Sequence, residues 1–106
     1  MPYAEKAGIK IAVENLFKWT PEKLVGSYGK PDELCAAVKE LGTDRFTACV
    51  DLGHAAITGT NPEDYIAGME DGMLGALHVQ DNDFRSDGHM LPFMGKTNWN
   101  AVMSAL

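Results

Sequence analysis

Three segments of the chain are apolar for most of their length and become polar towards their ends, and the first of them is rich in β-branched residues. They cover residues 9–16, 46–54 and 75–81. Each segment predicts a β-strand, and a nearly continuous apolar run is typical of strands that are buried on both faces of a parallel sheet. Polar side chains follow all three runs, so the ends of these strands are expected to carry the chemistry.

Helical patterns alternate with the predicted strands. Residues 32–42 open with two acids and close with Gly42, and residues 61–72 open with Asn61 and Pro62. Residues 3–8 resemble the last turns of a helix, and residues 98–106 resemble the first turns of another. Segments 17–31 and 82–97 are predicted to be long loops. This alternation predicts right-handed βαβ crossovers, a parallel α/β sheet, and a chain whose two ends lie inside larger elements.

Composition narrows the class of protein. The chain has 106 residues, 45% of them hydrophobic, and a formal net charge of −6. An acidic chain is poorly suited to nucleic acid, and the sequence has neither an apolar run of about 20 residues nor a signal-peptide pattern. We therefore expect one cytoplasmic domain with no nucleic-acid or membrane partner. Cys35 falls in a helix and Cys49 in a strand, so both are expected to be reduced and buried.

The carboxyl ends of parallel strands meet at one edge of a sheet, where parallel α/β proteins bind ligands. Ionisable residues in this chain gather there: Glu14, Asp51, His54, His78, Asp81, Asp83, Asp87 and His89. So many carboxylates repel one another unless a cation neutralises them. Mixed carboxylate and imidazole ligands suit Mn²⁺, Fe²⁺, Co²⁺ or Zn²⁺, and Mg²⁺ less well.

Four motifs in this order carry a family resemblance: residues 12–16 (AVENL), 50–54 (VDLGH), 77–82 (LHVQDN) and 87–92 (DGHMLP), followed by Gly95 and Trp99. Together they are similar to the xylose isomerase-like barrel superfamily, which includes sugar and sugar-phosphate isomerases and epimerases and the endonuclease IV type of repair enzyme. The resemblance implies that residues 1–106 form about three parallel βα units of a (β/α)8 TIM barrel. These would be roughly its fifth to seventh units.

The resemblance also implies roles for individual residues. Glu14, Asp51 and His78 would bind a divalent metal ion, with Glu14 also moving the substrate proton next to a carbonyl. His54, Asp87 and His89 would bind a small sugar or sugar phosphate, or a second metal ion in the nuclease branch. The second catalytic glutamate of such isomerases follows the eighth strand and is not among these residues. One copy of the chain is thus not expected to hold the whole site.

The sequence departs from the family pattern near its last motif. Members often have Leu-Pro-Gly-x-Gly before an acidic residue and Trp, whereas this chain has Phe93 at the first glycine position and Asn98 before Trp99. Because a phenylalanine enters the φ > 0 region only with strain, we expect this loop to be reshaped.

Other interpretations stay open for several residues. Glu14 taken alone could be a helix cap or an ion-pair partner, and Asp81, Asp83 and Arg85 could belong to a solvated loop. Phe17 and Trp19 could wall a sugar pocket or pack in the core. A different function is also possible: the chain could be a non-catalytic part of a barrel that self-associates, as a homo-oligomer or with a companion half-barrel, to cover its open sheet edges. An endonuclease IV-like nuclease is a third reading.

Overall fold

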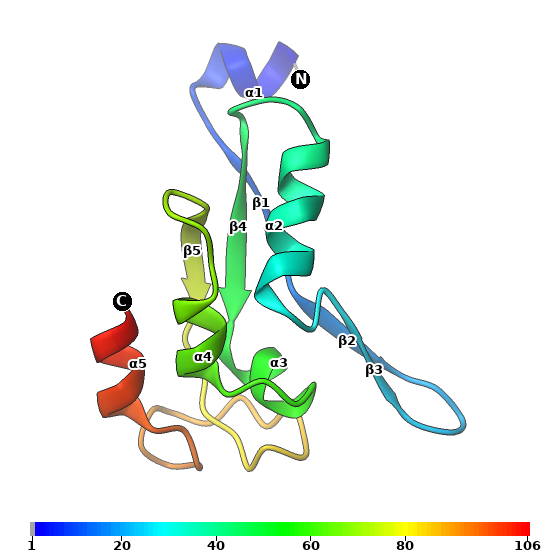
Figure 1. Ribbon diagram of the computed structural model, residues 1–106, viewed down its shortest axis with the longest axis vertical. Helices are drawn as coiled ribbons and strands as arrows, with labels where there is room; N and C mark the ends of the chain where they lie inside the picture. Colours follow the sequence, from blue (N-terminus) through cyan, green and yellow to red (C-terminus); the bar gives the residue numbers. More distant parts are fainter. Residues whose placement is uncertain (1) are drawn as a thin grey trace.

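The computed structural model describes residues 2–106 and contains a three-stranded parallel sheet (Figure 1). The sheet has the order β1-β4-β5, formed by β1 (Ile11–Glu14), β4 (Phe46–Asp51) and β5 (Leu74–His78). All three strands run in the same direction, so their carboxyl ends lie together at the lower end of the molecule in Figure 1. The predicted α/β fold with three parallel strands is confirmed.

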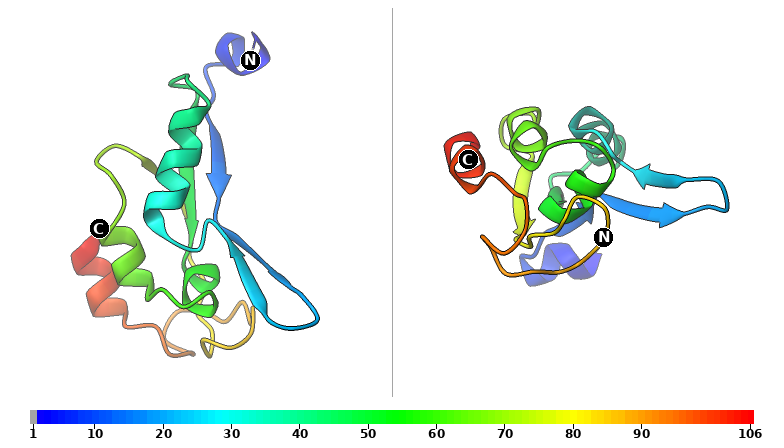
Figure 2. Two further views of the ribbon diagram at one scale, coloured as in Figure 1. Left: turned by 45° about the vertical axis from the view of Figure 1, so that its right-hand side comes forward. Right: turned by 90° about the horizontal axis from the view of Figure 1, so that it is seen from below.

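Helices cover one side of this sheet. The helices are α1 (Pro2–Ala7), α2 (Pro31–Glu40), α3 (Leu52–Ile57), α4 (Pro62–Ala67) and α5 (Trp99–Ala105). In both views of Figure 2, α2, α4 and α5 lie on the same side of the strands. Between them and the sheet lies the core, which includes Leu34, Val38, Val50, Leu52, Tyr65, Ile66, Trp99 and Val102. Burial of these side chains holds the strands in place and thereby positions their ends.

The other face of the sheet carries small and polar side chains. Since Ala48 and Val50 face the helices, the alternating residues Thr47, Cys49 and Asp51 face the opposite way. Ala76, beside Cys49 in the sheet, is exposed on this face. This is the face on which strand-end ligands approach one another.

Residues 17–31, expected to be a loop, instead contain an antiparallel hairpin. Strand β2 (Leu16–Trp19) pairs with β3 (Leu24–Ser27), and the hairpin projects from the body of the molecule (Figure 1). Strand β2 is mostly apolar and aromatic, which fits a strand, but it is only four residues long and follows β1 after a single residue. The glycine and proline residues nearby therefore led to the prediction of a loop.

The expected strand 46–54 was too long. It ends at Asp51, whose Oδ1 accepts a hydrogen bond from the backbone N–H of His54 at 2.9 Å and so caps α3. His54 consequently projects from a helix. Because His54 lies on α3 and not on β4, its two ring nitrogens approach the strand-end cluster from the helix.

Both cysteines are buried and unpaired, as predicted. Within residues 2–106, no helix combines the length and apolar character needed to cross a membrane.

Removing Leu34, which has no exposed surface in the core, tests how much the α2 interface stabilises the sheet. We expect Leu34→Ala to lower the free energy of unfolding by roughly 2–5 kcal/mol, because the cavity left behind closes only partly. Leu41→Ala, the same change at a residue that is 45% exposed, should cost about 0.5 kcal/mol or less. Urea unfolding followed by circular dichroism measures both. Equal losses would mean that α2 does not form this interface.

Candidate metal centre at the strand ends

Side chains from all three parallel strands meet at their carboxyl ends. His78 Nδ1 lies 3.0 Å from Glu14 Oε1 and 3.6 Å from Asp51 Oδ2. The sheet register explains the convergence, because Asp51 pairs with His78 and Glu14 pairs with the residue two before Asp51. The three residues predicted as metal ligands are thus adjacent in space.

His54 enters the same cluster from α3. Its Nδ1 lies 2.9 Å from the carbonyl oxygen of Asn15 and 3.4 Å from Glu14 Oε1. A carbonyl oxygen can only accept, so Nδ1 carries a proton and Nε2 is the atom free to bind a ligand or a second proton. Nε2 faces two carboxylates, those of Asp87 at 3.5 Å and Asp51 at 3.8 Å.

Asp87 and His89 come from the long loop after β5. His89 Nε2 lies 3.0 Å from Asp87 Oδ2. Two overlapping donor groups result, in each of which one ligand atom per residue lies within 4.8 Å of the others. One consists of Glu14, Asp51 and His54, and the other of His54, Asp87 and His89. His54 therefore stands between the strand-end carboxylates and the loop.

The charge of this cluster fits a cation. Across residues 2–106, the carboxylates of Glu14, Asp51 and Asp87 lie within 4 Å of histidine ring nitrogens and form an ion pair with no lysine or arginine. Burial alone would raise the pKa of Asp87, but hydrogen bonds from Gln80 and His89 and the nearby His54 outweigh it and hold that pKa below its usual value. Carboxylate and imidazole donors at this spacing can hold a divalent metal ion.

Cys49 lies directly below these carboxylates in the sheet. Burial, together with the charges of Glu14 and Asp51, raises the pKa of its thiol. A thiol kept protonated is a poor metal ligand, so the oxygen and nitrogen donors above it define the site.

Two amide side chains were not assigned roles from the sequence. Asn15 is 1% exposed, and its side chain donates to the carbonyl of Asp51 at 3.1 Å and accepts from the Asp51 N–H at 2.7 Å. Gln80 is buried between Asp51 and Asp87. The alternation of polar residues His78, Gln80 and Asn82 beyond the end of β5 is a signal that could have revealed Gln80.

Asp81 anchors the loop that carries Asp87 and His89. This fully buried carboxylate accepts hydrogen bonds of 2.9–3.1 Å from the backbone N–H groups of Asn82, Phe93, Gly95 and Thr97 and from Trp99 Nε1. Burial would raise the pKa of Asp81, but the bonds from Trp99, Thr97 and Gly95 outweigh it and lower the pKa to about 2. Asp81 is therefore structural, and Asp83 caps a turn of the same loop by accepting from the N–H groups of Arg85 and Ser86.

Phe93 enters the left-handed region, which a phenylalanine reaches only with strain. Its φ is 74°, and its N–H binds Asp81 as one of the five donors above. A conformation that costs about 1–3 kcal/mol is thus held by a buried charge and by the Phe93 ring against Trp99, with centroids 5.9 Å apart. The hydrogen bond from the Phe93 N–H to Asp81 offsets this strain, and a reshaping of the loop relative to the family pattern stays a prediction.

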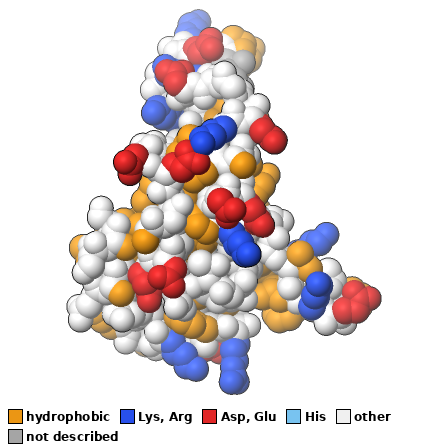
Figure 3. Space-filling model, in the orientation of Figure 1, with side chains coloured by type: hydrophobic (Ala, Val, Ile, Leu, Met, Phe, Trp, Pro, Cys, Tyr) orange, Lys and Arg blue, Asp and Glu red, His pale blue; other side chains and the backbone are white. Residues whose placement is uncertain are grey.

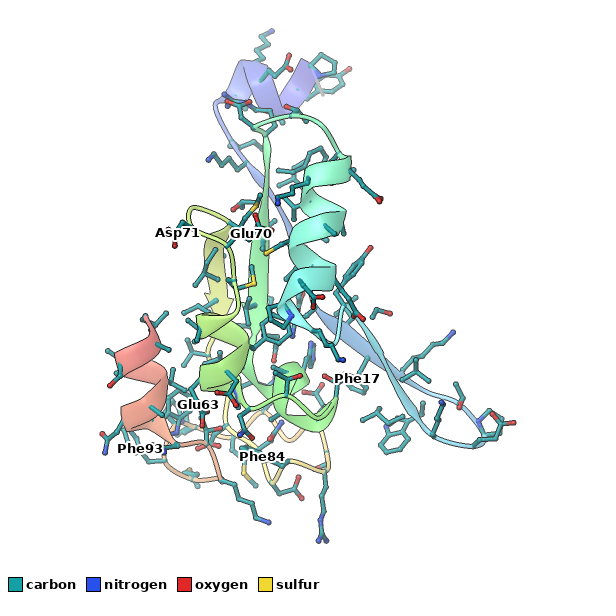
Figure 4. All side chains as sticks on the ribbon, in the orientation of Figure 1. Phe17, Glu63, Glu70, Asp71, Phe84 and Phe93 are labelled. Atoms are coloured by element: carbon teal, nitrogen blue, oxygen red, sulfur yellow. The ribbon has the colours of Figure 1, made fainter. Side chains whose placement is uncertain are left out.

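Aromatic residues flank the cluster. Phe17, labelled in Figure 4 at the base of the hairpin, packs edge-on against the His54 ring at a centroid distance of 5.0 Å. Phe84 and Phe93 lie in the loop beyond the strand ends in the same view. Trp19 is 65% exposed on the hairpin and does not pack in the core.

Comparison with known proteins agrees with this geometry. Residues 1–106 match the family described as xylose isomerase-like TIM barrel, and the chain belongs to that family. A crystal structure of a D-tagatose 3-epimerase-like protein superimposes with a TM-score of 0.78 at 26% identity, over 99% of this chain and 38% of that one.

Two curated relatives are uncharacterised proteins. One, from Methanocaldococcus jannaschii, is 30% identical in an alignment of 106 positions that covers 97% of this chain and 34% of the relative. The other, from Sinorhizobium fredii, is 28% identical over 98 residues, which is 92% of this chain and 29% of the relative. The chain thus spans about a third of each relative and corresponds to part of a barrel.

The role of Asp81 predicts a specific pH dependence. The pKa of Asp81 is lowered from 3.8 to about 2 on folding, so its contribution to stability is fully present above about pH 4 and is lost as the pH falls towards 2. We expect Asp81→Asn to lower the free energy of unfolding at pH 7 by roughly 1.5–3 kcal/mol, since an amide replaces a charged acceptor. Urea unfolding between pH 2 and 7 should show a weaker acid dependence in this variant than in the wild type.

Asp71→Asn is the matched control, because Asp71 is exposed and lies far from the strand ends (Figure 4). It should leave both the stability and the pH profile nearly unchanged. An Asp81→Asn variant with the wild-type acid profile would contradict the anchoring role.

Proposed function

We propose that this chain supplies the metal-binding strand ends of a sugar or sugar-phosphate isomerase or epimerase, at about the fifth to seventh units of its barrel. The observation that carries the proposal is the convergence of Glu14, Asp51 and His78 from three consecutive parallel strands. The epimerase-like structural neighbour supports the reaction class. Because the chain spans about a third of its relatives, the activity is that of a whole barrel.

In this proposal Glu14, Asp51 and His78 hold one divalent ion of Mn, Co, Zn, Fe or Mg. When bound, the ion would hold two substrate oxygens and stabilise the negative charge that develops on them. Glu14 moves a proton at the carbon next to the carbonyl, since its carboxylate lies in the cluster and its side chain is 26% exposed to a ligand.

The loop residues complete the substrate side of the site. Asp87 accepts hydrogen bonds from substrate hydroxyl groups, and His54 Nε2 and His89 bind hydroxyl or phosphate groups. The Phe17 ring beside His54 excludes water from one flank. His89 is 65% exposed and can turn towards a ligand.

A second candidate function is self-association without catalysis. Strands β1 and β5 lie at the two edges of the sheet. An open groove of about 780 Å³ beside β1 is lined by Tyr3, Ala4, Lys6, Ala7, Ile9 and Ile11. Unpaired edges and exposed apolar residues favour pairing with another chain. Size-exclusion chromatography with light scattering tests this candidate, and a stable monomer would contradict it.

A nuclease of the endonuclease IV type is the third candidate, favoured by the donor group of His54, Asp87 and His89. The net charge of −6 opposes it, and the lysine and arginine side chains on the face shown in Figure 3 are scattered without a continuous basic patch. Salt-dependent affinity for abasic-site DNA would favour this candidate over the isomerase.

Metal binding can be measured directly. Calorimetric titration with Mn²⁺ should show binding to the wild type, and Asp51→Asn and His78→Ala should each weaken it by at least about 10-fold, because each removes a donor. Asp71→Asn should bind as the wild type does. Equal affinity in all four proteins would place the ion elsewhere.

Proton transfer can be measured by isotope exchange. The experiment uses a whole barrel that contains residues 1–106. When this protein is loaded with metal in D₂O, we expect deuterium to enter a ketose at the carbon next to its carbonyl. Glu14→Gln should reduce the rate by about 100-fold or more, since it removes the base. Glu22→Gln at the exposed hairpin turn is the matched control and should have no effect. Exchange that persists in Glu14→Gln would assign the base to another residue.

A further inference from the structure

Gln80 connects the two donor groups of the candidate site. Its side chain is only 5% exposed and lies between Asp51 and Asp87. Nε2 donates to Asp51 at 3.0 Å (Oδ1) and 3.2 Å (Oδ2) and to Asp87 Oδ1 at 2.9 Å. Oε1 accepts the backbone N–H of His89 at 3.1 Å. Every polar atom of this amide is therefore used by a residue of the site.

The amide can adopt only one orientation. Carboxylate oxygens accept and a backbone N–H donates, so exchanging Nε2 and Oε1 would place an acceptor against two carboxylates and a donor against the His89 N–H. The packing also fixes the position of the side chain, because a Cβ added to Gly53 would lie 2.4 Å from Gln80 Cδ. Gln80 thus lies flush against the backbone at the start of α3, the helix that carries His54.

The contacts of Asp51 show what this orientation achieves. Oδ1 of Asp51 accepts from both the His54 N–H at 2.9 Å and Gln80 Nε2 at 3.0 Å. Oδ2 is the oxygen that faces the ring nitrogens, 3.6 Å from His78 Nδ1 and 3.8 Å from His54 Nε2. Gln80 Nε2 also donates to Oδ2 at 3.2 Å, so Gln80 fixes the carboxylate as a whole, and the His54 N–H holds Oδ1 while Oδ2 faces the cluster.

We propose that Gln80 is a positioning residue that fixes the Asp51 carboxylate at the metal site and ties it to the loop of Asp87 and His89. The inference rests on the proposed metal-binding function. Binding of an ion at Asp51 changes the charge that Gln80 Nε2 meets, and the same amide carries that change to Asp87 and to the His89 N–H. Cation binding and the order of the substrate-binding loop are coupled through one side chain.

The test compares Gln80→Met with Asn82→Leu. Methionine keeps the length of glutamine without its polar atoms. Asn82 is a matched control, because it is also a fully buried amide and donates to the Gly53 carbonyl at 3.0 Å but touches none of the proposed ligands. Co²⁺ titration followed by visible absorption reports both the affinity and the geometry of the ligands. Thermal unfolding of each variant confirms that the titrated protein is folded.

We expect Gln80→Met to weaken Co²⁺ binding by about 10- to 100-fold and to change the Co²⁺ spectrum, since partners that orient a ligand have effects of this size. Asn82→Leu should lower thermal stability but keep the spectrum and the affinity of its folded form within about 2-fold of the wild type.

Amide NMR spectra with Zn²⁺ test the coupling. The His89 N–H resonance should shift on binding in the wild type and should shift far less in Gln80→Met. If Gln80→Met kept the Co²⁺ affinity and spectrum of the wild type, or if its His89 N–H shifted on Zn²⁺ binding as much as in the wild type, the role of Gln80 would be overturned. The proposed metal site would not be affected by that result. Failure of the wild-type protein to bind Co²⁺ would overturn the proposed metal site and this inference together.

Discussion

Three carboxylates surround the His54 ring, and the rest of the site depends on how their repulsion is balanced. Oxygens of Glu14, Asp51 and Asp87 lie within 3.4–3.8 Å of its two nitrogens. Parallel strands impose this crowding, because their ends cannot separate while the core between sheet and helices stays packed. The Gln80 amide and the backbone N–H of His54 donate hydrogen bonds to these carboxylates but carry no net charge. A divalent ion would offset the negative charge that remains.

Buried polar side chains away from the cluster give it a rigid frame. Asn15 bridges the end of β1 to both backbone groups of Asp51, and Asp81 gathers five N–H donors from the loop and from α5. The polar atoms of both side chains are hydrogen-bonded, and a buried polar group that finds its partners stabilises a unique structure. The strained Phe93 shows the strength of this frame, because its conformation persists on account of the bonds to Asp81.

The parts of the fold that depend on local pattern could be predicted from the sequence. The three strands, α2, α4 and the placement of Glu14, Asp51 and His78 at one edge follow from apolar runs that end in polar residues. The hairpin was missed because its strands are short and interrupted by turn residues. Helix α3 was missed because Leu52 and Gly53 continue the apolar run of β4, whereas the cap at Asp51 that starts the helix is a matter of geometry. The alternation of polar residues after β5 indicates that Gln80 faces the site, but the local sequence does not show which groups the Gln80 and Asp81 side chains bind.

Anomalous diffraction from crystals of the Mn²⁺-loaded protein, recorded at the manganese edge, locates the ion without reference to activity. The account predicts a peak bounded by Glu14, Asp51 and His78, with Asp51 Oδ2 as the coordinating oxygen. A structure in which the ion lies elsewhere and those three side chains point away from one another would contradict it.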